Sequence, residues 1–405
     1  MSVTLLPALI SMVRLKTTSA TPLLQPLMRL IAEFVIKHYR VLSMVLPVVV
    51  AMLAFGTTRI ELDDNFIKYF SDKFELRRDT DFIEARLTGL NAIEYSMPAA
   101  GAGAISDPQY LTAVDEFAQW LKTQPKVTNV GSLSVTIKEL NKSMHGDDPA
   151  YHRIPQSREL AAQYLLLYEM SLPYGLDLNN SIDIDKSQSR VVAIIQDASS
   201  GDIRDLNTAA EQWLSTNHNR FFAEGNGLSM AFAYVSERNI RSMLFGSLLA
   251  LLSISFILVV ALRSVKTGLI SLVPNLVPAA VALGIWGYLV GEVGLSVAVV
   301  VAVTLGIVVD DTVHFLTKYL AARRTHELGV EDAIRETMQS VGVALWITSM
   351  ALIAGFGVLF LSGFKVNAEM GVLSAVTILI ALIADYLLLP AVLLRFDRRV
   401  SVSRD

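Results

Sequence analysis

The sequence of 405 residues contains no cysteine, so disulfides, thiolate metal sites, iron–sulfur clusters and cysteine nucleophiles are excluded. Charged residues are also scarce. They make up 18% of the chain, whereas a soluble globular protein carries about a quarter, and 53% of the residues are hydrophobic. This composition argues against a wholly soluble enzyme and against a disordered chain.

The few charges are unevenly distributed along the chain. Residues 59–238 hold 26 acidic and 17 basic side chains, a net charge of −9, and the remainder holds 12 acidic and 17 basic side chains, a net charge of +5. The two parts are therefore expected to face different surroundings. No basic patch stands out, so a nucleic-acid partner is not expected.

Long apolar runs occupy much of the remaining sequence. A helix needs about 20 apolar residues to cross a bilayer. Six runs are close to this length: 41–58, 242–262, 268–290, 295–317, 341–361 and 371–394. Any one of them could be a buried helix of a soluble core, but six in one chain favour membrane helices.

Basic residues in the short connections predict the orientation, because Lys and Arg concentrate on the cytoplasmic side. They lie before the first run, between the second and third, between the fourth and fifth, and after the sixth. The opposite loops, 291–294 and 362–370, carry one lysine between them. We therefore predict a multi-pass protein of the plasma (inner) membrane with both termini in the cytoplasm and residues 59–238 outside it.

The extracytoplasmic segment has no membrane-length apolar run and the size of an ordinary domain. Strands are expected at 92–97, 127–135 and 190–196, with a further strand opening at 221–223, and helices at 108–123, 158–170 and 203–216. Two strand–helix–strand units predict a split α+β domain of two similar lobes. The predicted fold is thus a bundle of six transmembrane helices with one extracytoplasmic α+β domain between helices 1 and 2.

The predicted organisation has five parts. They are a cytoplasmic segment at 1–40, a membrane helix at 41–58, the extracytoplasmic domain at 59–238, a five-helix membrane domain at 239–394 and a cytoplasmic tail at 395–405.

A short repeat connects the two ends of the sequence. The tetrapeptide Leu-Leu-Pro-Ala occurs at 5–8 and again at 388–391, each time ahead of basic residues. We interpret residues 1–12 as the stub of a preceding helix, which would make the chain the second repeat of a two-repeat transporter. A signal peptide is the alternative, although the basic residues here follow the apolar run rather than precede it.

The most informative motif lies in the fourth predicted helix, at 306–314, with the sequence Gly-Ile-Val-Val-Asp-Asp-Thr-Val-His. Ionisable side chains inside a membrane helix are costly and usually functional. Spacings of three and four place His314 one turn from both Asp310 and Asp311. We interpret the three residues as a proton relay. A structural ion pair is one alternative, and a zinc site, which needs more ligands than are visible, is another.

Further polar residues are expected at the same depth. Asn275, Thr348, Ser349 and Asp385 each lie about eight to ten residues from a predicted cytoplasmic boundary, or roughly 10–15 Å at 1.5 Å per residue. We predict that they form one layer with the acids. Burial favours the neutral form of a carboxyl group, and a neighbouring acid favours it further, as proton carriage requires. Taken singly, Thr348 and Ser349 are better explained as contacts between helices.

Two prolines, Pro274 and Pro278, fall within the third predicted helix. Proline frees backbone carbonyls and permits bending. The two residues are interpreted as a hinge, with a static kink as the alternative.

These motifs resemble the second half of an exporter of the resistance–nodulation–division (RND) superfamily, MMPL type. The five-helix part also resembles the core shared by Patched and sterol-sensing proteins. The resemblance is carried by residues 272–278, 306–314, 329–334, 354–362 and Asp385 with 389–391. It implies a proton-driven exporter of hydrophobic or lipidic substrates, in which Asp310 and Asp311 carry protons and residues 59–238 form a porter-like domain.

A typical member of this family has two such halves, whereas one is present here. The resemblance therefore implies a partner half, either a second copy or a separately encoded first half. No Gly-Lys-Ser/Thr phosphate loop and no serine nucleophile motif are present, so neither nucleotide, cofactor nor enzymatic activity is expected. The alternatives are a non-transporting lipid sensor or assembly protein of the sterol-sensing type, and an inactive truncated remnant.

Overall fold

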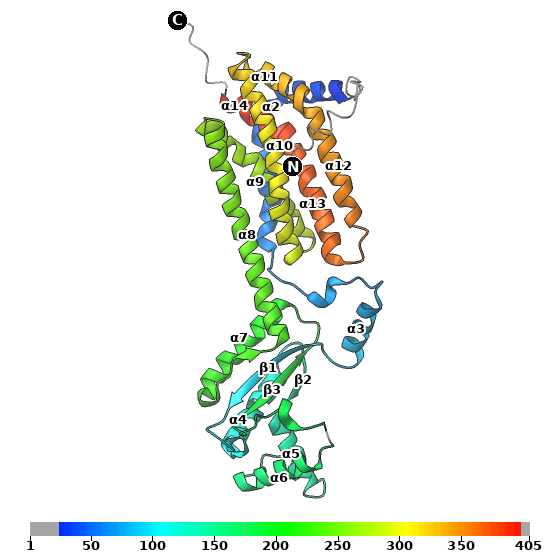
Figure 1. Cartoon of the computed structure of the whole chain (residues 1–405), viewed down its shortest axis with the longest axis vertical. Helices are drawn as coiled ribbons and strands as arrows, with labels where there is room; N and C mark the ends of the chain where they lie inside the picture. The colour runs from blue at the N-terminus through cyan, green and yellow to red at the C-terminus, as the bar shows by residue number, and fades with distance from the viewer. Residues whose placement is uncertain (1–23, 174, 398–405) are drawn as a thin grey trace, which may run out of the picture.

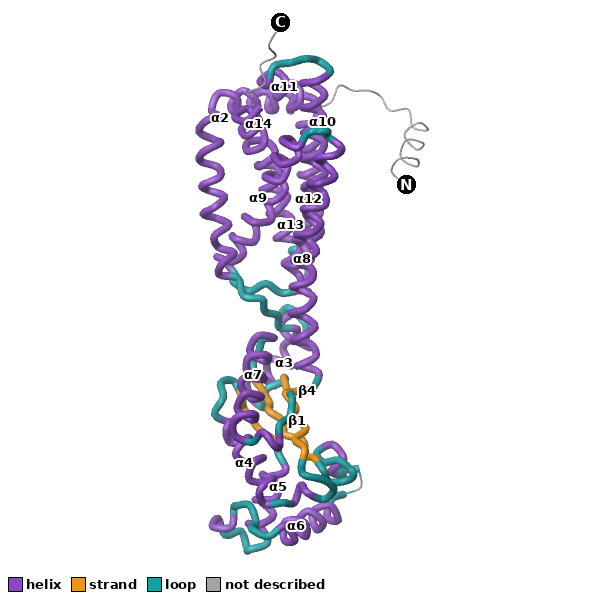
Figure 2. Tube along the Cα trace, turned by 90° about the vertical axis from the view of Figure 1, so that its left-hand side faces the viewer, coloured by secondary structure: helices purple, strands orange, loops and turns teal. Residues whose placement is uncertain are grey.

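Six helices in the described part of the chain are long and apolar enough to cross a membrane, which confirms the number predicted. The computed structural model describes residues 24–173 and 175–397. Figures 1 and 2 show these helices packed in one bundle, with a smaller α+β domain beyond one end of it. The bundle contains α2 (Leu24–Ala54), α8 (Leu228–Ala261), α9 (Val265–Leu289), α10 (Leu295–Arg324), α11 (Val330–Thr337), α12 (Val343–Leu359), α13 (Lys365–Ile383) and α14 (Leu389–Phe396). Helices α11 and α12 together form one of the six spans, and α13 and α14 form another.

Helix α2 begins well before the predicted start of the first membrane helix. Met28 and Ala32 lie one turn apart, and both are buried against the other helices. Arg335 of α11 donates a hydrogen bond of 2.8 Å to Glu33 Oε1. The later part of the predicted cytoplasmic segment 1–40 is therefore a packed part of the bundle.

The stub interpretation of residues 1–12 falls outside the described residues. The same holds for most of the predicted tail at 395–405, of which the structure describes the first three residues.

The smaller domain, called the sheet domain below, is built on one antiparallel sheet with the strand order β2-β3-β1-β4. Its strands are β1 (Asn91–Pro98), β2 (Val127–Gly131), β3 (Gln188–Ile195) and β4 (Gly225–Asn226). Its larger helices are α3 (Glu75–Arg86), α4 (Pro108–Lys122), α5 (Leu133–Ser143), α6 (Arg158–Ser171) and α7 (Ser200–Asn217).

The prediction of two similar lobes is wrong. The two strand–helix–strand units, β1-α4-β2 and β3-α7-β4, interleave in a single sheet, because β1 pairs with β3 along its whole length from Asn91↔Ile195 to Pro98↔Gln188. The predicted strand at 127–135 ends at Gly131, since α5 begins at Leu133. One shared core therefore holds both units together.

Helix α8 joins the sheet domain to the bundle. It starts at Leu228, two residues after β4, and continues to Ala261 without interruption. Its 34 residues extend about 51 Å at 1.5 Å per residue, more than the about 30 Å of a bilayer core. Figure 1 shows α8 running from the sheet domain along the full height of the bundle. One continuous helix is therefore shared by the sheet domain and the bundle.

Two π-helical segments interrupt the other helices of the bundle. Met338–Gly342 connects α11 to α12, and Ala384–Leu388 connects α13 to α14. The Tyr386 hydroxyl donates a hydrogen bond of 2.6 Å to the carbonyl of Gly342 and so joins the two segments. Such segments occur frequently at functional sites.

Candidate functional site

Helix α10 places neighbouring residues of its acidic motif against two different helices. Ser349 Oγ of α12 donates to Asp311 Oδ2 at 3.3 Å. The next residue, Thr312, donates from Oγ1 to Asp385 Oδ1 at 3.0 Å. Asp311 and Asp385 thus each accept a hydrogen bond from a hydroxyl group, and together with the donors Ser349 and Thr312 they form the candidate site.

Asp385 is the most enclosed acid of the site. It lies in the π-helical segment Ala384–Leu388 and is 1% exposed. Its Oδ2 atom has no hydrogen-bond partner among the described residues. A buried polar atom normally has a partner, so this oxygen is free to bind a proton or a water molecule.

Asn275 of α9 is equally buried, and neither of its amide atoms has a hydrogen-bond partner in the described chain. Helix α9 packs against both α10 and the segment Ala384–Leu388. Pro274 and Pro278 are also buried in α9, and the helix continues through both prolines from Val265 to Leu289.

Asp310 and His314 lie on the outer side of α10. Their side chains are 73% and 64% exposed, and His314 Nε2 is 3.7 Å from Asp310 Oδ1, one turn away as the spacing predicts. The structure therefore separates Asp310 from the half-buried Asp311 and the buried Asp385, although it is next to Asp311 in the sequence.

Thr348 is also apart from the site. It is exposed, and its hydroxyl donates to the carbonyls of Ala344 and Leu345 in its own helix at 3.1 and 3.0 Å. Of the two adjacent residues expected in the polar layer, only Ser349 points toward the acids.

Sequence reasoning missed Thr312 and Tyr386 as site residues. Thr312 supplies the donor to Asp385, and Tyr386 joins the two π-helical segments. Thr312 lies between Asp311 and His314 in the motif, and Tyr386 follows Asp385 directly. Adjacency to an intramembrane acid was the only signal for either residue.

A third missed residue, Asp64, connects the sheet domain to the start of α10. The buried Asp64 Oδ2 accepts hydrogen bonds from the Tyr69 hydroxyl at 2.7 Å, from Ser236 Oγ of α8 at 2.9 Å and from the backbone N–H of Leu295 at 3.4 Å. Leu295 is the first residue of α10, where a carboxylate is favourable. Burial and the hydrogen bond to Asp64 raise the pKa of Tyr69 well above its usual range, so Tyr69 remains a neutral donor.

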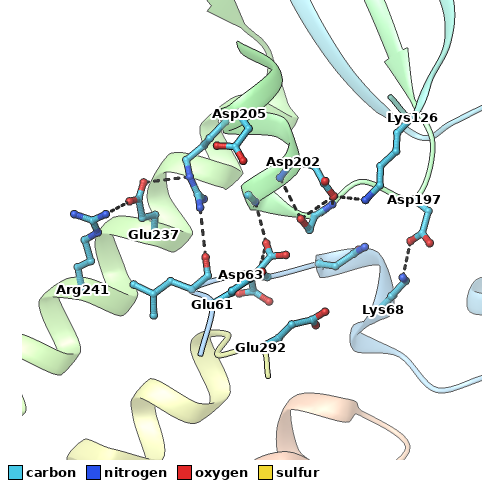
Figure 3. Close-up of a pocket in the computed structure, with 16 residues that line it drawn as sticks. Glu61, Asp63, Lys68, Lys126, Asp197, Asp202, Asp205, Glu237, Arg241 and Glu292 are labelled. Carbon is cyan, nitrogen blue, oxygen red and sulfur yellow. Dashed lines mark hydrogen bonds and ion pairs between the residues drawn. The ribbon is translucent and has the colours of Figure 1, made fainter. Parts of the chain in front are cut away.

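A cavity of about 640 Å³ lies beside Asp64, between the sheet domain and the bundle (Figure 3). The four basic residues of its lining form the ion pairs Lys68–Asp197, Lys126–Asp202, Arg204–Glu237 and Arg241–Glu237. These pairs use three of the eight acidic residues of the lining, which is therefore acidic overall.

At Asp202 in this lining, burial alone would raise the pKa, but hydrogen bonds from Lys126 and Ser199 outweigh it and lower the pKa. A cavity lined by so many charges differs from the apolar pockets that bind hydrophobic ligands. Among the described residues, no group of three or more His, Asp or Glu side chains is placed to hold a metal ion.

Comparisons with known proteins agree with this architecture. Residues 194–405 match the profile of the MMPL family. The chain belongs to the MMPL family. This match confirms the resemblance seen in the motifs and, with the six apolar helices, identifies a multi-pass membrane protein.

Two individual proteins are similar to the chain. The membrane protein MJ1562 of Methanocaldococcus jannaschii is 24% identical over 160 residues, which cover 40% of this chain and 41% of that protein. The cryo-EM structure of the hedgehog release protein Disp from the water bear Hypsibius dujardini has a similar fold, with a TM-score of 0.56 and 14% identity over 94% of this chain. The match covers 51% of the Disp chain, so the present chain spans about half of its length.

The bond between Thr312 and Asp385 is testable. The Thr312→Val variant keeps the shape of the side chain but leaves both carboxyl oxygens of Asp385 without a donor. We expect a loss of about 1–3 kcal/mol in the stability of the bundle, measured by thermal unfolding of the full chain in detergent.

The matched control is Thr337→Val, since the buried Thr337 hydroxyl bonds only to the Ala333 carbonyl in its own helix. Equal losses in the two variants would show that the contact between Thr312 and Asp385 has no special role.

Proposed function

We propose that this chain is one half of a proton-driven secondary exporter of hydrophobic or lipidic molecules, with Asp311 and Asp385 as its proton-carrying groups. One observation carries the proposal. Two carboxyl groups lie in the membrane bundle with hydroxyl donors beside them and no Lys or Arg partner in the described part of the chain. A structural ion pair, the main alternative, would need such a partner.

The hydrogen bonds of the site provide a means of coupling. A proton that binds Asp311 or Asp385 removes a charge from the contact between α10 and its neighbours. At its other end α10 starts beside Asp64, which also binds Ser236 of α8. Since α8 continues into the sheet domain, a shift of α10 would change the position of the sheet domain through α8.

The orientation proposed from the sequence is supported by the position of the basic residues. The end of the bundle opposite the sheet domain holds Arg263, Lys266, Arg324, Arg335 and Arg395. Lys and Arg favour the cytoplasmic side. We therefore place this end in the cytoplasm and the sheet domain outside, as a porter-like domain of a plasma (inner) membrane protein.

A partner half is supported by the exposed face of α10. Val303, Gly306, Asp310, His314 and Thr317 recur at spacings of three and four and are all exposed. An acid and a histidine facing lipid at this depth would be costly. We propose that a second half, either another copy or a separately encoded chain, covers this face and completes the relay through Asp310 and His314.

The lipidic substrate class is supported by the MMPL family and by the similarity in fold to Disp. A non-transporting lipid sensor is the second candidate function. It shares the five-helix core but needs no titrating acid, so substitution of the acids separates the two functions.

For transport, we expect Asp311→Asn, Asp385→Asn and Asp310→Asn to abolish export driven by a pH gradient while leaving membrane insertion intact. Asparagine nearly keeps the shape of the acid but cannot bind and release a proton. Asp311→Glu should retain part of the activity. The measurement is the movement of a fluorescent phospholipid in vesicles with an imposed pH gradient.

The control for this series is Asp332→Asn, because Asp332 is an exposed acid of α11 that pairs with Arg335. Full gradient-driven transport by both Asp311→Asn and Asp385→Asn would contradict the relay and favour the sensor.

The topology can be tested with single cysteines, because the chain has none of its own. Ile184→Cys lies in the sheet domain, where Ile184 is 94% exposed, and Thr325→Cys lies at the exposed end of α10. A membrane-impermeant maleimide should label the first variant in intact cells and the second only after permeabilisation. The reverse pattern would invert the proposed orientation.

The partner half can be tested by photocrosslinking in native membranes. Benzoylphenylalanine in place of Val303 should give a protein adduct, of about twice the chain mass for a homodimer and of another mass for a separate half. The same probe in place of Phe256, an exposed residue of α8, serves as the control. Lipid adducts alone at Val303 would contradict a partner on this face.

A further inference from the structure

Helices α10 and α13 pair polar residues at a constant offset in the sequence. Near the sheet-domain end of the bundle, Ser296 Oγ of α10 donates to Glu369 Oε2 of α13 at 2.6 Å. Sixteen residues further along both helices, Thr312 of α10 donates to Asp385. The two residues of each pair are 73 positions apart, so the helices run in the same direction and in register.

A third pair, defined by the same offset and not by a hydrogen bond between its members, lies midway between these two. Thr304 of α10 and Thr377 of α13 are eight residues from each neighbouring pair, keep the same offset, and are 1% and 2% exposed. Because both helices rise by about 1.5 Å per residue, the two threonines lie at the same level, about 12 Å from the pairs on either side.

The threonine hydroxyls are suited to pass on a proton. Each donates to a carbonyl in its own helix, Thr304 to Val300 at 2.8 Å and Thr377 to Leu373 at 2.7 Å. A hydroxyl that donates in this way still has acceptor capacity. Two such acceptors at one level can bind a water molecule that enters between the helices.

The two ends of this series differ in their access to water. Glu369 borders a small polar cavity together with Asp64 and Tyr69, and its side chain is 20% exposed. Lys365 Nζ lies 3.5 Å from Glu369 Oε1, one turn away on the same helix. At the other end, Asp385 is enclosed, and its Oδ2 atom has no partner among the described residues.

We propose that these three pairs, Ser296–Glu369, Thr304–Thr377 and Thr312–Asp385, form the route by which protons pass from the extracytoplasmic side to the buried acids. The proposal rests on the proposed function and adds the route to it. The Glu369 carboxylate takes a proton from outside water and releases it to water molecules beside Thr304 and Thr377. The proton then binds Asp385, which accepts the hydrogen bond of Thr312 in the last pair. Thr312 directly follows Asp311 in the sequence.

Water access is the first test, and it needs no transport. In single-cysteine variants of the full chain in liposomes, we expect aminoethyl methanethiosulfonate to modify Thr377→Cys at least about tenfold faster than Ile378→Cys. Ile378 is the adjacent residue of α13 and is 1% exposed, so it is a control at the same depth. Equal rates at the two positions would overturn the route.

Proton movement is the second test. Liposomes with a trapped pH-sensitive dye report proton uptake during gradient-driven export of a fluorescent phospholipid. We expect the Thr304→Val/Thr377→Val double variant and Glu369→Gln each to slow uptake by about tenfold or more, while the control Thr337→Val keeps the wild-type rate. Should the double variant misfold, Glu369→Gln, which keeps the acceptor for Ser296, decides alone.

The two proposals can fail separately. If both route variants take up protons at the wild-type rate while Asp311→Asn is inactive in export, the route is overturned and the relay remains in place. Export by the unmodified chain that ignores the pH gradient would overturn the relay and the route together.

Discussion

The structure depends on how two carboxyl groups are accommodated inside an apolar bundle. Asp311 and Asp385 face hydroxyl donors rather than cations, so nothing in the described chain holds them permanently in the charged form. An unpaired charge would be expensive there, and a neutral acid would be much less so. The cost of the charged state ties the protonation of these groups to the packing of α10 against α12 and the segment Ala384–Leu388.

The same helix links this site to the sheet domain. Asp64 receives three hydrogen bonds, one of them from the first N–H of α10 and another from α8. In the part of the chain that the structure describes, Figure 2 shows loops and α8 passing between the bundle and the sheet domain, so the connection is narrow. One buried carboxylate in this connection thus bonds to both membrane helices, α8 and α10.

The sequence predicted the number of membrane helices and the acidic motif, because length, hydropathy and intramembrane charge are local properties. It could not tell which residue of an adjacent pair faces the core. Asp310 points outward and Asp311 inward, and Thr348 and Ser349 divide in the same way. Since a membrane helix is apolar on all sides, its pattern lacks the stripe that marks the buried face of a soluble helix. The two-lobe prediction failed because strand partners depend on long-range pairing, here of β1 with β3.

The central claim is that the free energy of a pH gradient moves a lipidic substrate through this chain. The most direct measurement follows a fluorescent phospholipid in liposomes that contain the unmodified chain together with its partner half. An imposed pH gradient should drive the lipid against its own concentration gradient, and an ionophore that collapses the pH gradient should stop it at once. Movement at the same rate with and without the ionophore would contradict the account.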